Sequence, residues 1–213
     1  MHTGDSVAAV DEAYIHELRG LDRWDDDQYS FFVDALASAS KSGDTRRLDD
    51  LLDASKRAYP ITHEQYAAYN IALVYACMFA QEEAVALLLN DARVDPTHRQ
   101  YACLRAACSI DNPSIVRTLL WDPRVDPSFD DCMVLFDTCE LGGYRVMPAL
   151  LLHPAVQRSL RTDQLVDHAF RFRNLSAMRA ILLHAKLLRP QRFEARLVHN
   201  DLNHRDEQPR PRR

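Results

Sequence analysis

The chain has 213 residues, of which 47% are hydrophobic, and its formal net charge is −5, so its composition is ample for a folded core. The sequence contains no run of 18 apolar residues and no basic N-terminus followed by an apolar stretch, which excludes a membrane span and a signal peptide. A sheet-based fold is disfavoured because the chain has only five glycines, few aromatic residues and no alternating β-branched runs.

The N-terminal region is acidic, since residues 1–34 hold nine acidic side chains and only two arginines. Residues 7–21 predict an amphipathic helix whose apolar stripe consists of Val7, Val10, Tyr14, Leu18 and Leu21. We assign residues 1–29 to an acidic N-terminal segment whose helix caps the region that follows; a helix that binds a partner is the alternative. Asp25, Asp26 and Asp27 are expected to cap a further helix that begins near Tyr29.

The region from residue 30 to residue 187 is periodic. Arg93-Val94-Asp95-Pro96 recurs 31 residues later as Arg124-Val125-Asp126-Pro127, and a degenerate third copy contains Val156. Four further series keep this interval: Leu88, Leu119, Leu150 and Ile181; Leu89, Leu120, Leu151 and Leu182; Cys77, Cys108, Cys139 and Phe170; and Ala76, Ala107, Thr138 and Ala169. A period of this length predicts a solenoid in which each unit buries its apolar face against its neighbours.

We divide the periodic region into five units of two helices each, at about residues 30–57, 66–97, 98–128, 129–158 and 160–187, the first of which is divergent. In the third unit, residues 102–109 and 114–121 predict the two helices, and Pro113 suits the first turn of the second helix. Residues 188–213 are expected to form a C-terminal helix that closes the stack, followed by a basic tail that is disordered because it lacks apolar residues.

Three segments carry a resemblance to a known family: Leu73-Val74-Tyr75-Ala76-Cys77, Leu104-Arg105-Ala106-Ala107-Cys108 and Ser114-Ile115-Val116-Arg117-Thr118-Leu119-Leu120. They resemble the Leu-His-x-Ala-Ala first helix and the Glu-Ile-Val-x-x-Leu-Leu second helix of ankyrin repeats. The units are shorter than the usual 33 residues or so and lack the Thr-Pro-Leu-His start. They look like the divergent ankyrin arrays of protists and of large DNA viruses of amoebae. The resemblance implies an all-α solenoid of about five helix-turn-helix repeats with helical caps.

The resemblance also implies where a partner binds, because ankyrin arrays recognise proteins on a concave face. Its exposed positions correspond to Tyr69, Asn70, Gln100, Tyr101, Asp131, Thr162 and Asp163, and its turns to Gln81, Asp111, Asn112, Arg173 and Asn174. Phe129, in a loop, is a further candidate. Tyr69, Tyr101 and Phe129 are the sharpest candidates because aromatic side chains are enriched in binding hot spots. The alternative is that these residues pack against the neighbouring loop.

Neither catalysis nor metal binding is indicated by the sequence. The spacing of Cys103, Cys108, Cys132 and Cys139 is poor for zinc, and three of the five cysteines fall in apolar positions. His153 and His184 share one register, where they are expected to cap the ends of helices. No phosphate-binding loop or hydrolase motif occurs. We therefore expect no enzyme, no cofactor and no metal, and we place the protein in a reducing compartment.

The expected function is that of a non-catalytic protein–protein interaction module, acting as a monomer in the cytoplasm, with the nucleus or a viral origin in a host cytoplasm also compatible. Nucleic acid is disfavoured because three arginines in the tail supply few phosphate contacts. No membrane contact is expected. Two alternatives remain: an adaptor whose N-terminal segment recruits a second protein, such as a ubiquitin-ligase component, and a structural component of a larger particle that self-associates.

Overall fold

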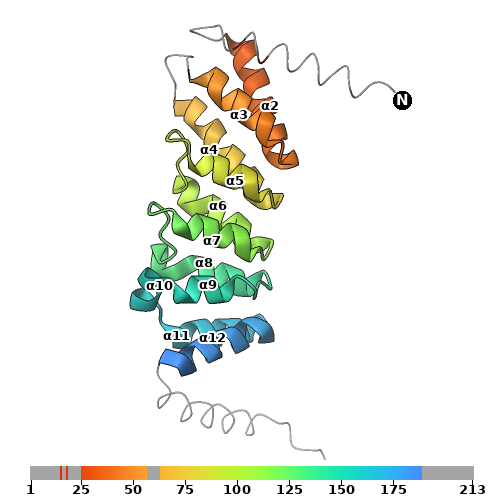
Figure 1. Cartoon of the computed structure of the whole chain (residues 1–213). Helices are drawn as coiled ribbons and strands as arrows, with labels where there is room; N and C mark the ends of the chain where they lie inside the picture. Colours follow the sequence, from red (N-terminus) through yellow and green to blue (C-terminus); the bar gives the residue numbers. More distant parts are fainter. Residues whose placement is uncertain (1–14, 16–17, 19–24, 57–62, 189–213) are drawn as a thin grey trace, which may run out of the picture.

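The computed structural model describes residues 15, 18, 25–56 and 63–188, and in this part of the chain every regular element is a helix (Figure 1). The helices are α2 (Asp26–Ser42), α3 (Thr45–Ser55), α4 (His63–Met78), α5 (Glu82–Leu89), α6 (His98–Ser109), α7 (Pro113–Trp121), α8 (Phe129–Glu140), α9 (Met147–Leu152), α10 (Pro154–Ser159), α11 (Thr162–Arg171) and α12 (Leu175–Leu188). The expected all-α fold is confirmed. Among the described residues, none of these helices has the length and apolarity needed to cross a membrane.

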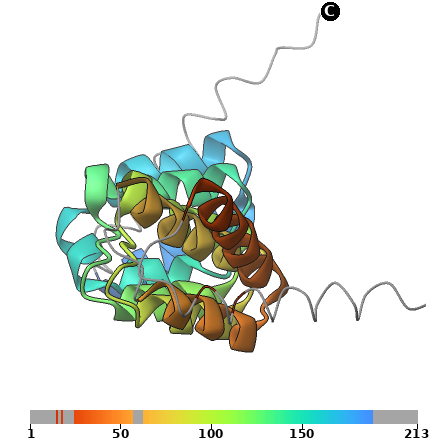
Figure 2. The same cartoon turned by 90° about the horizontal axis from the view of Figure 1, so that it is seen from above.

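The helices form two layers that run along one column. The first layer contains α2, α4, α6, α8 and α11, each packed against the next, and the second layer contains α3, α5, α7, α9 and α12. Each helix of the first layer also packs against the second-layer helix that follows it in the chain. Figure 1 shows the pairs stacked from α2 to α12, and the view from above in Figure 2 shows successive pairs overlying one another.

The core lies between the two layers, at positions that recur every 31 residues. Leu88, Leu119, Leu150 and Ile181 are fully buried, and so are the small residues Ala76, Ala107, Thr138 and Ala169. Burial of each large aliphatic side chain contributes about 1.5 to 3 kcal/mol, and the small residues let neighbouring helices approach closely. The series of Cys77, Cys108, Cys139 and Phe170 is uniform only in part, since the three cysteines are buried whereas Phe170 is exposed.

The helix ends follow ordinary capping rules. The Asp25 carboxylate accepts a hydrogen bond from the Gln28 backbone N–H, and the Gln28 side chain accepts one from the Asp25 N–H, which completes a capping box. The cap predicted around residues 25–27 is therefore confirmed for Asp25. Pro113 and Pro148 lie in the first turns of α7 and α9, where the missing N–H leaves no helical bond unmade.

Part of the N-terminal prediction lies within the described residues. Ile15 and Leu18 are helical and belong to the buried core. This burial agrees with a segment that covers the first helix pair. The remainder of the helix predicted at residues 7–21 lies outside the described residues, as do residues 57–62 and the C-terminal region beyond residue 188.

Two first-layer helices begin with a short left-handed turn. Residues 99–101 of α6 and residues 130–132 of α8 have φ between 50° and 67°, and right-handed helix follows. The first helix of the third unit was predicted from residue 102, where the right-handed part begins. A non-glycine residue in this conformation is disfavoured by roughly 1 to 2 kcal/mol, so the surroundings must hold these turns in place.

Candidate interaction surface

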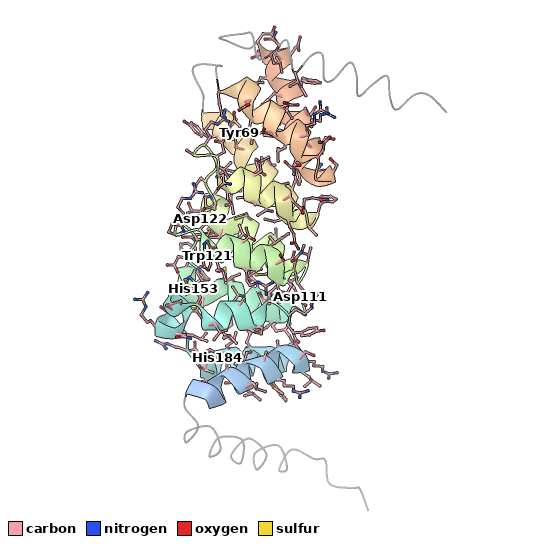
Figure 3. The ribbon with its side chains drawn as sticks, in the orientation of Figure 1. Tyr69, Asp111, Trp121, Asp122, His153 and His184 are labelled. Atoms are coloured by element: carbon pink, nitrogen blue, oxygen red, sulfur yellow. The ribbon has the colours of Figure 1, made fainter. Side chains whose placement is uncertain are left out.

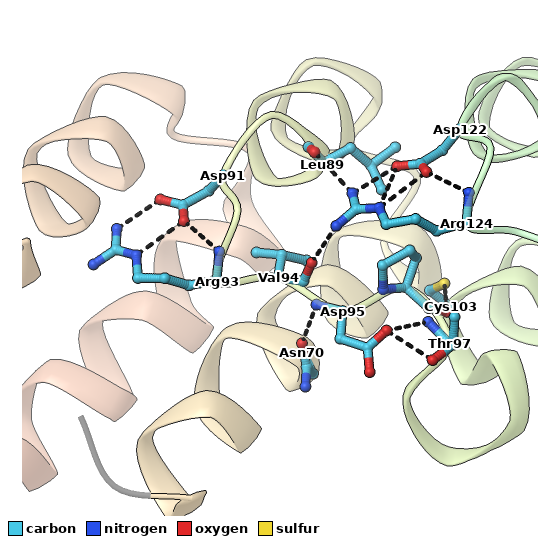
Figure 4. Close-up of polar contacts among 11 residues, drawn as sticks. Asn70, Leu89, Asp91, Arg93, Val94, Asp95, Thr97, Cys103, Asp122 and Arg124 are labelled. Carbon is cyan, nitrogen blue, oxygen red and sulfur yellow. Dashed lines mark hydrogen bonds and ion pairs between the residues drawn. The ribbon is translucent and has the colours of Figure 1, made fainter.

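The chain passes from α5 to α6 through a hairpin that is held by Arg93. All five N–H donors of this guanidinium group are used: two contact Asp91 oxygens at 2.9 and 2.6 Å, and the others contact Ser55 Oγ at 2.8 Å, Tyr69 Oη at 3.1 Å and the Leu52 carbonyl oxygen at 2.9 Å. The Arg93 and Asp91 side chains are only 12% and 10% exposed. One arginine thus joins the hairpin to α3 and α4 (Figure 4 shows its contacts with Asp91).

The electrostatics of this ion pair follow from its burial. Burial alone would raise the pKa of Asp91, but the hydrogen bonds from the Arg93 side chain and backbone outweigh it and hold the pKa below its usual value. Burial likewise opposes charge on Arg93, and the bonds to Asp91 raise its pKa nonetheless. Both groups are therefore charged at neutral pH in the folded protein.

A second hairpin, between α7 and α8, repeats this arrangement with Arg124. Its guanidinium binds Asp122 at 2.6 Å, the Val94 carbonyl oxygen at 2.7 Å and the Leu89 carbonyl oxygen at 3.1 Å (Figure 4). Each arginine therefore donates to a backbone carbonyl near the C-terminus of the second helix of the preceding pair: Arg93 to Leu52 of α3 and Arg124 to Leu89 of α5. Carbonyls in the last turn of a helix have no backbone N–H partner within that helix.

The third copy of the motif has diverged, with Ala155 at the position of the arginine, and the short helix α10 takes the place of the hairpin. His153 Nδ1 accepts a hydrogen bond from the Ala155 backbone N–H at 3.4 Å, at the start of α10. His153 therefore follows α9 at its predicted place, but its ring nitrogen caps the N-terminus of α10, whereas a cap on the carbonyls at the end of α9 was expected.

Two of the predicted partner contacts, Tyr69 and Asn70, are buried, so the exposure predicted for them is wrong. Tyr69 is 2% exposed: its ring packs edge-on against Phe32 at 5.7 Å and lies 4.6 Å from the Arg93 guanidinium. Asn70 is 5% exposed and its side-chain oxygen accepts the Asp95 backbone N–H at 2.7 Å. Both residues hold the hairpin against α4, because Arg93 and Asp95 fold back over that helix.

The predicted turn residues mainly join neighbouring helix pairs. Asp111 Oδ1 accepts the backbone N–H groups of Tyr144, Arg145 and Val146 at 2.8 to 3.1 Å. Figure 3 places Asp111 at the edge of the column opposite Trp121. The three bonds fix the turn of the next pair, so the Asp111 carboxylate is engaged within the fold.

The other turn residues have similar roles. Asn112 caps α7 by accepting the Ser114 and Ile115 N–H groups, and Asn174 caps α12 through the Ala177 N–H. The Asn174 amide also donates to the Cys139 and Gly143 carbonyls, and the Gln81 amide donates to the Lys41 carbonyl at 2.9 Å. The alternative interpretation, packing against the neighbouring loop, describes these residues. Arg173 is exposed and adopts a positive φ of 54°.

One cluster of predicted residues forms an accessible surface. The rings of Tyr101 and Phe129 lie 5.3 Å apart, and Phe129 is 44% exposed. Met133 extends this apolar surface, while Gln100 and Asp131 are exposed in the left-handed turns beside it. We call Tyr101, Phe129 and Met133 the aromatic cluster. Thr162 and Asp163 are separate from it, in the first turn of α11, where Thr162 is half-buried and Asp163 exposed.

A longer apolar surface was not predicted from the sequence. Phe79, Ile110, Leu141 and Phe172 occur at intervals of 31 residues, and each directly follows a helix of the first layer. Their exposed fractions are 50%, 38%, 60% and 47%. Phe79 and Ile110 line an open hollow of about 660 Å³. We call these four residues the turn-edge row. The period of 31 residues contains this signal, because the four positions recur at the same interval as the core positions.

In the described part of the chain, no three His, Cys, Asp or Glu side chains are grouped so that they could hold a metal ion. The five cysteines are free and buried, and burial raises the pKa of Cys103, Cys108 and Cys139 to about 12. These three thiols are protonated at neutral pH and pack as small apolar side chains.

Comparison with known proteins returned no matching family model, no matching curated protein and no matching solved structure.

Proposed function

We propose that this chain is an ankyrin-like repeat solenoid that binds a protein partner and carries no catalytic machinery of its own. The observation that carries the proposal is the turn-edge row, in which four large apolar side chains remain exposed at one register along successive helix pairs. Exposed apolar residues scattered singly are ordinary, but a regular row of them is typical of an interaction surface. The two layers of paired helices and the period of 31 residues support the comparison with ankyrin repeats.

The aromatic cluster supports the same function from the start of the first-layer helices. Tyr101 and Phe129 offer a large contact area. Tyr101 belongs to the left-handed turn of α6, and Phe129 directly precedes the left-handed turn of α8, so the backbone holds both rings in place before binding. A preformed surface loses little conformational entropy when it binds, which favours affinity. Of the residues predicted to contact a partner, we retain Gln100, Tyr101, Phe129 and Asp131 in this proposal.

A protein is a better partner than a small molecule because of the shape of the surface. The turn-edge row follows the C-terminal ends of α4, α6, α8 and α11, and the hollow beside Phe79 and Ile110 is open to solvent. Pockets for small molecules usually enclose most of the ligand surface, whereas protein interfaces spread over many residues of a broad surface.

The experiment that tests this function is affinity capture with the intact chain and two variants, read by mass spectrometry. In the first variant, Phe79, Ile110, Leu141 and Phe172 are each replaced by Gln. In the control, the exposed side chains Tyr66 and Arg161, which belong neither to the turn-edge row nor to the aromatic cluster, are replaced by Gln. We expect the first variant to lose a protein that the intact chain and the control both capture. Once that protein has been purified, the first variant should bind it more weakly than the intact chain does. Identical capture by all three chains would refute the turn-edge row as the binding surface.

A further inference from the structure

A second row of exposed apolar residues lies on three helices of the second layer, at positions different from those of the turn-edge row. Trp121, Leu152 and Leu183 occur at intervals of 31 residues on α7, α9 and α12, and their exposed fractions are 91%, 62% and 57%. Figure 3 shows Trp121, together with His153 and His184, which directly follow Leu152 and Leu183 in the chain, along one edge of the column. We call these three apolar residues the outer row.

Trp121 is the most unusual member of the outer row. Tryptophan is highly buried on average, and it is the residue type most enriched among binding hot spots. Trp121 also borders an open hollow of about 440 Å³ between α5 and α7, which is lined by Ala86, Leu89, Arg117 and Thr118. An apolar side chain of a partner can therefore enter beside the indole ring and contact Trp121 and Leu89 together.

The border of the outer row is basic. Arg117 and Arg179 are exposed and lie one helical turn before Trp121 and Leu183, at the same register. The described sequences of α7, α9 and α12 contain no Asp or Glu. Arg158 is exposed on α10, which lies beside Leu152. Asp122, which also lines the hollow, is held by Arg124 at 2.6 Å and is 10% exposed. The outer row therefore attracts negative charge.

We propose that the outer row docks an acidic amphipathic helix of a protein partner, which runs along the column across α7, α9 and α12. Neighbouring packed helices lie about 10 Å apart, so successive members of the row are separated by roughly that distance. In an α-helix, residues seven apart share one face and are also separated by about 10 Å. Three apolar residues at seven-residue intervals therefore match Trp121, Leu152 and Leu183.

An extended strand does not match this spacing. Side chains on one face of a strand repeat about every 7 Å, so a second residue falls short of Leu152 and a third lies beyond it. Acidic residues beside the apolar stripe of a helix, by contrast, reach Arg117 and Arg179. The inference concerns a different surface from the turn-edge row and does not depend on it.

The test uses Trp121 as its own reporter, since the chain has only two tryptophans and Trp24→Phe leaves Trp121 as the single indole. The probe is a synthetic helical peptide with three leucines at seven-residue intervals, flanked by glutamates. One control peptide has the same composition in scrambled order, and a second carries lysine in place of each glutamate. We expect a saturable blue shift of the Trp121 emission with the first peptide only.

Variants then locate the binding site by fluorescence anisotropy of the labelled peptide. Leu183→Ser, Trp121→Ser and the double variant Arg117→Glu, Arg179→Glu are each expected to weaken binding about tenfold. The matched controls Tyr66→Ser and Arg171→Glu, at exposed positions outside both rows, are expected to leave the Kd unchanged. All these side chains are exposed, so thermal unfolding should show that each variant remains folded.

Three results would overturn the proposal. One is equal binding of the scrambled peptide, which would remove the match in spacing. Another is absence of binding by the glutamate-flanked peptide. The third is a blue shift with vesicles of phosphatidylcholine and phosphatidylserine in place of the peptide, which would assign the outer row to an anionic membrane surface.

Discussion

The two hairpins that contain Arg-Val-Asp-Pro have the same motif but different surroundings. Arg93 is 12% exposed and reaches Ser55, Tyr69 and a carbonyl of α3, whereas Arg124 is 38% exposed and reaches two backbone carbonyls. Gln100 occupies the position that Tyr69 has one period earlier, so the second arginine lacks the aromatic partner. A repeated motif therefore conserves the hairpin geometry, while its contribution to stability depends on the neighbouring residues.

The largest expected effect of this difference is that of Arg93→Ala. The substitution leaves the Asp91 carboxylate buried without its ion pair and removes one of the two side-chain donors to the Leu52 carbonyl, the other being the Ser55 hydroxyl. We expect the free energy of unfolding to fall by about 3 kcal/mol, as is typical when one partner of a buried pair is removed. Urea unfolding followed by circular dichroism measures the loss as a lower midpoint at unchanged slope. A loss no larger than that of Arg124→Ala would contradict the comparison.

Arg124→Ala is expected to have a smaller effect, of about 1 to 1.5 kcal/mol. More than a third of the Arg124 side chain is exposed, so water already screens its ion pair with Asp122 in the wild-type chain. After the substitution, water can solvate the Asp122 carboxylate in place of Arg124. The carbonyls of Leu89 and Val94 lose a donor, and water can replace it in part. The same urea titration, run beside Arg93→Ala, measures the difference between the two hairpins directly. Leu141→Ala, at an exposed apolar position, serves as a control with little expected change.

Much of the fold was predictable because the period of 31 residues repeats the core positions. Leu119 and Ala107 are buried, as their 31-residue series predict, and Pro113 begins a helix as its chemistry predicts. The burial of Tyr69 was not predictable, since it depends on an arginine 24 residues away whose side chain folds back over α4. The turn-edge row and the outer row were visible as periodic positions, yet their exposure becomes evident only when the helix ends are placed in three dimensions.

Tyr69→Phe removes the tyrosine hydroxyl from the Arg93 network. The ring and its packing against Phe32 remain, while the hydroxyl that accepts a bond from Arg93 Nη1 is lost. We expect a loss of about 0.5 to 1 kcal/mol in the free energy of unfolding, the usual net contribution of one hydrogen bond. Tyr66→Phe, at a tyrosine that is 42% exposed, is the matched control and should be nearly neutral. In the Arg93→Ala background the effect of Tyr69→Phe should largely disappear, because Arg93→Ala has already removed the bond that the two side chains share. A double-mutant cycle measures this coupling.

The smallest expected effect separates the two hairpins by pH. The pKa of Asp91 and that of Asp122 are both lowered in the folded protein, Asp91 by the Arg93 bonds against burial and Asp122 chiefly by the Arg124 side chain. A lowered folded pKa contributes stability above the unfolded value of about 3.9, and this contribution is lost as the pH falls through the folded pKa.

The difference in unfolding free energy between the wild-type chain and Asp91→Asn should therefore be full near neutral pH and shrink below pH of about 4. Asp122→Asn should follow the same direction with a smaller amplitude, and added salt should reduce that amplitude further, because its arginine is more exposed to screening ions. Urea midpoints measured from neutral pH into the acid range, at low and high salt, test both statements. A difference for Asp91→Asn that stayed constant with pH would show that the carboxylate contributes through its shape and neutral hydrogen bonds, and that its charge is not what distinguishes the first hairpin.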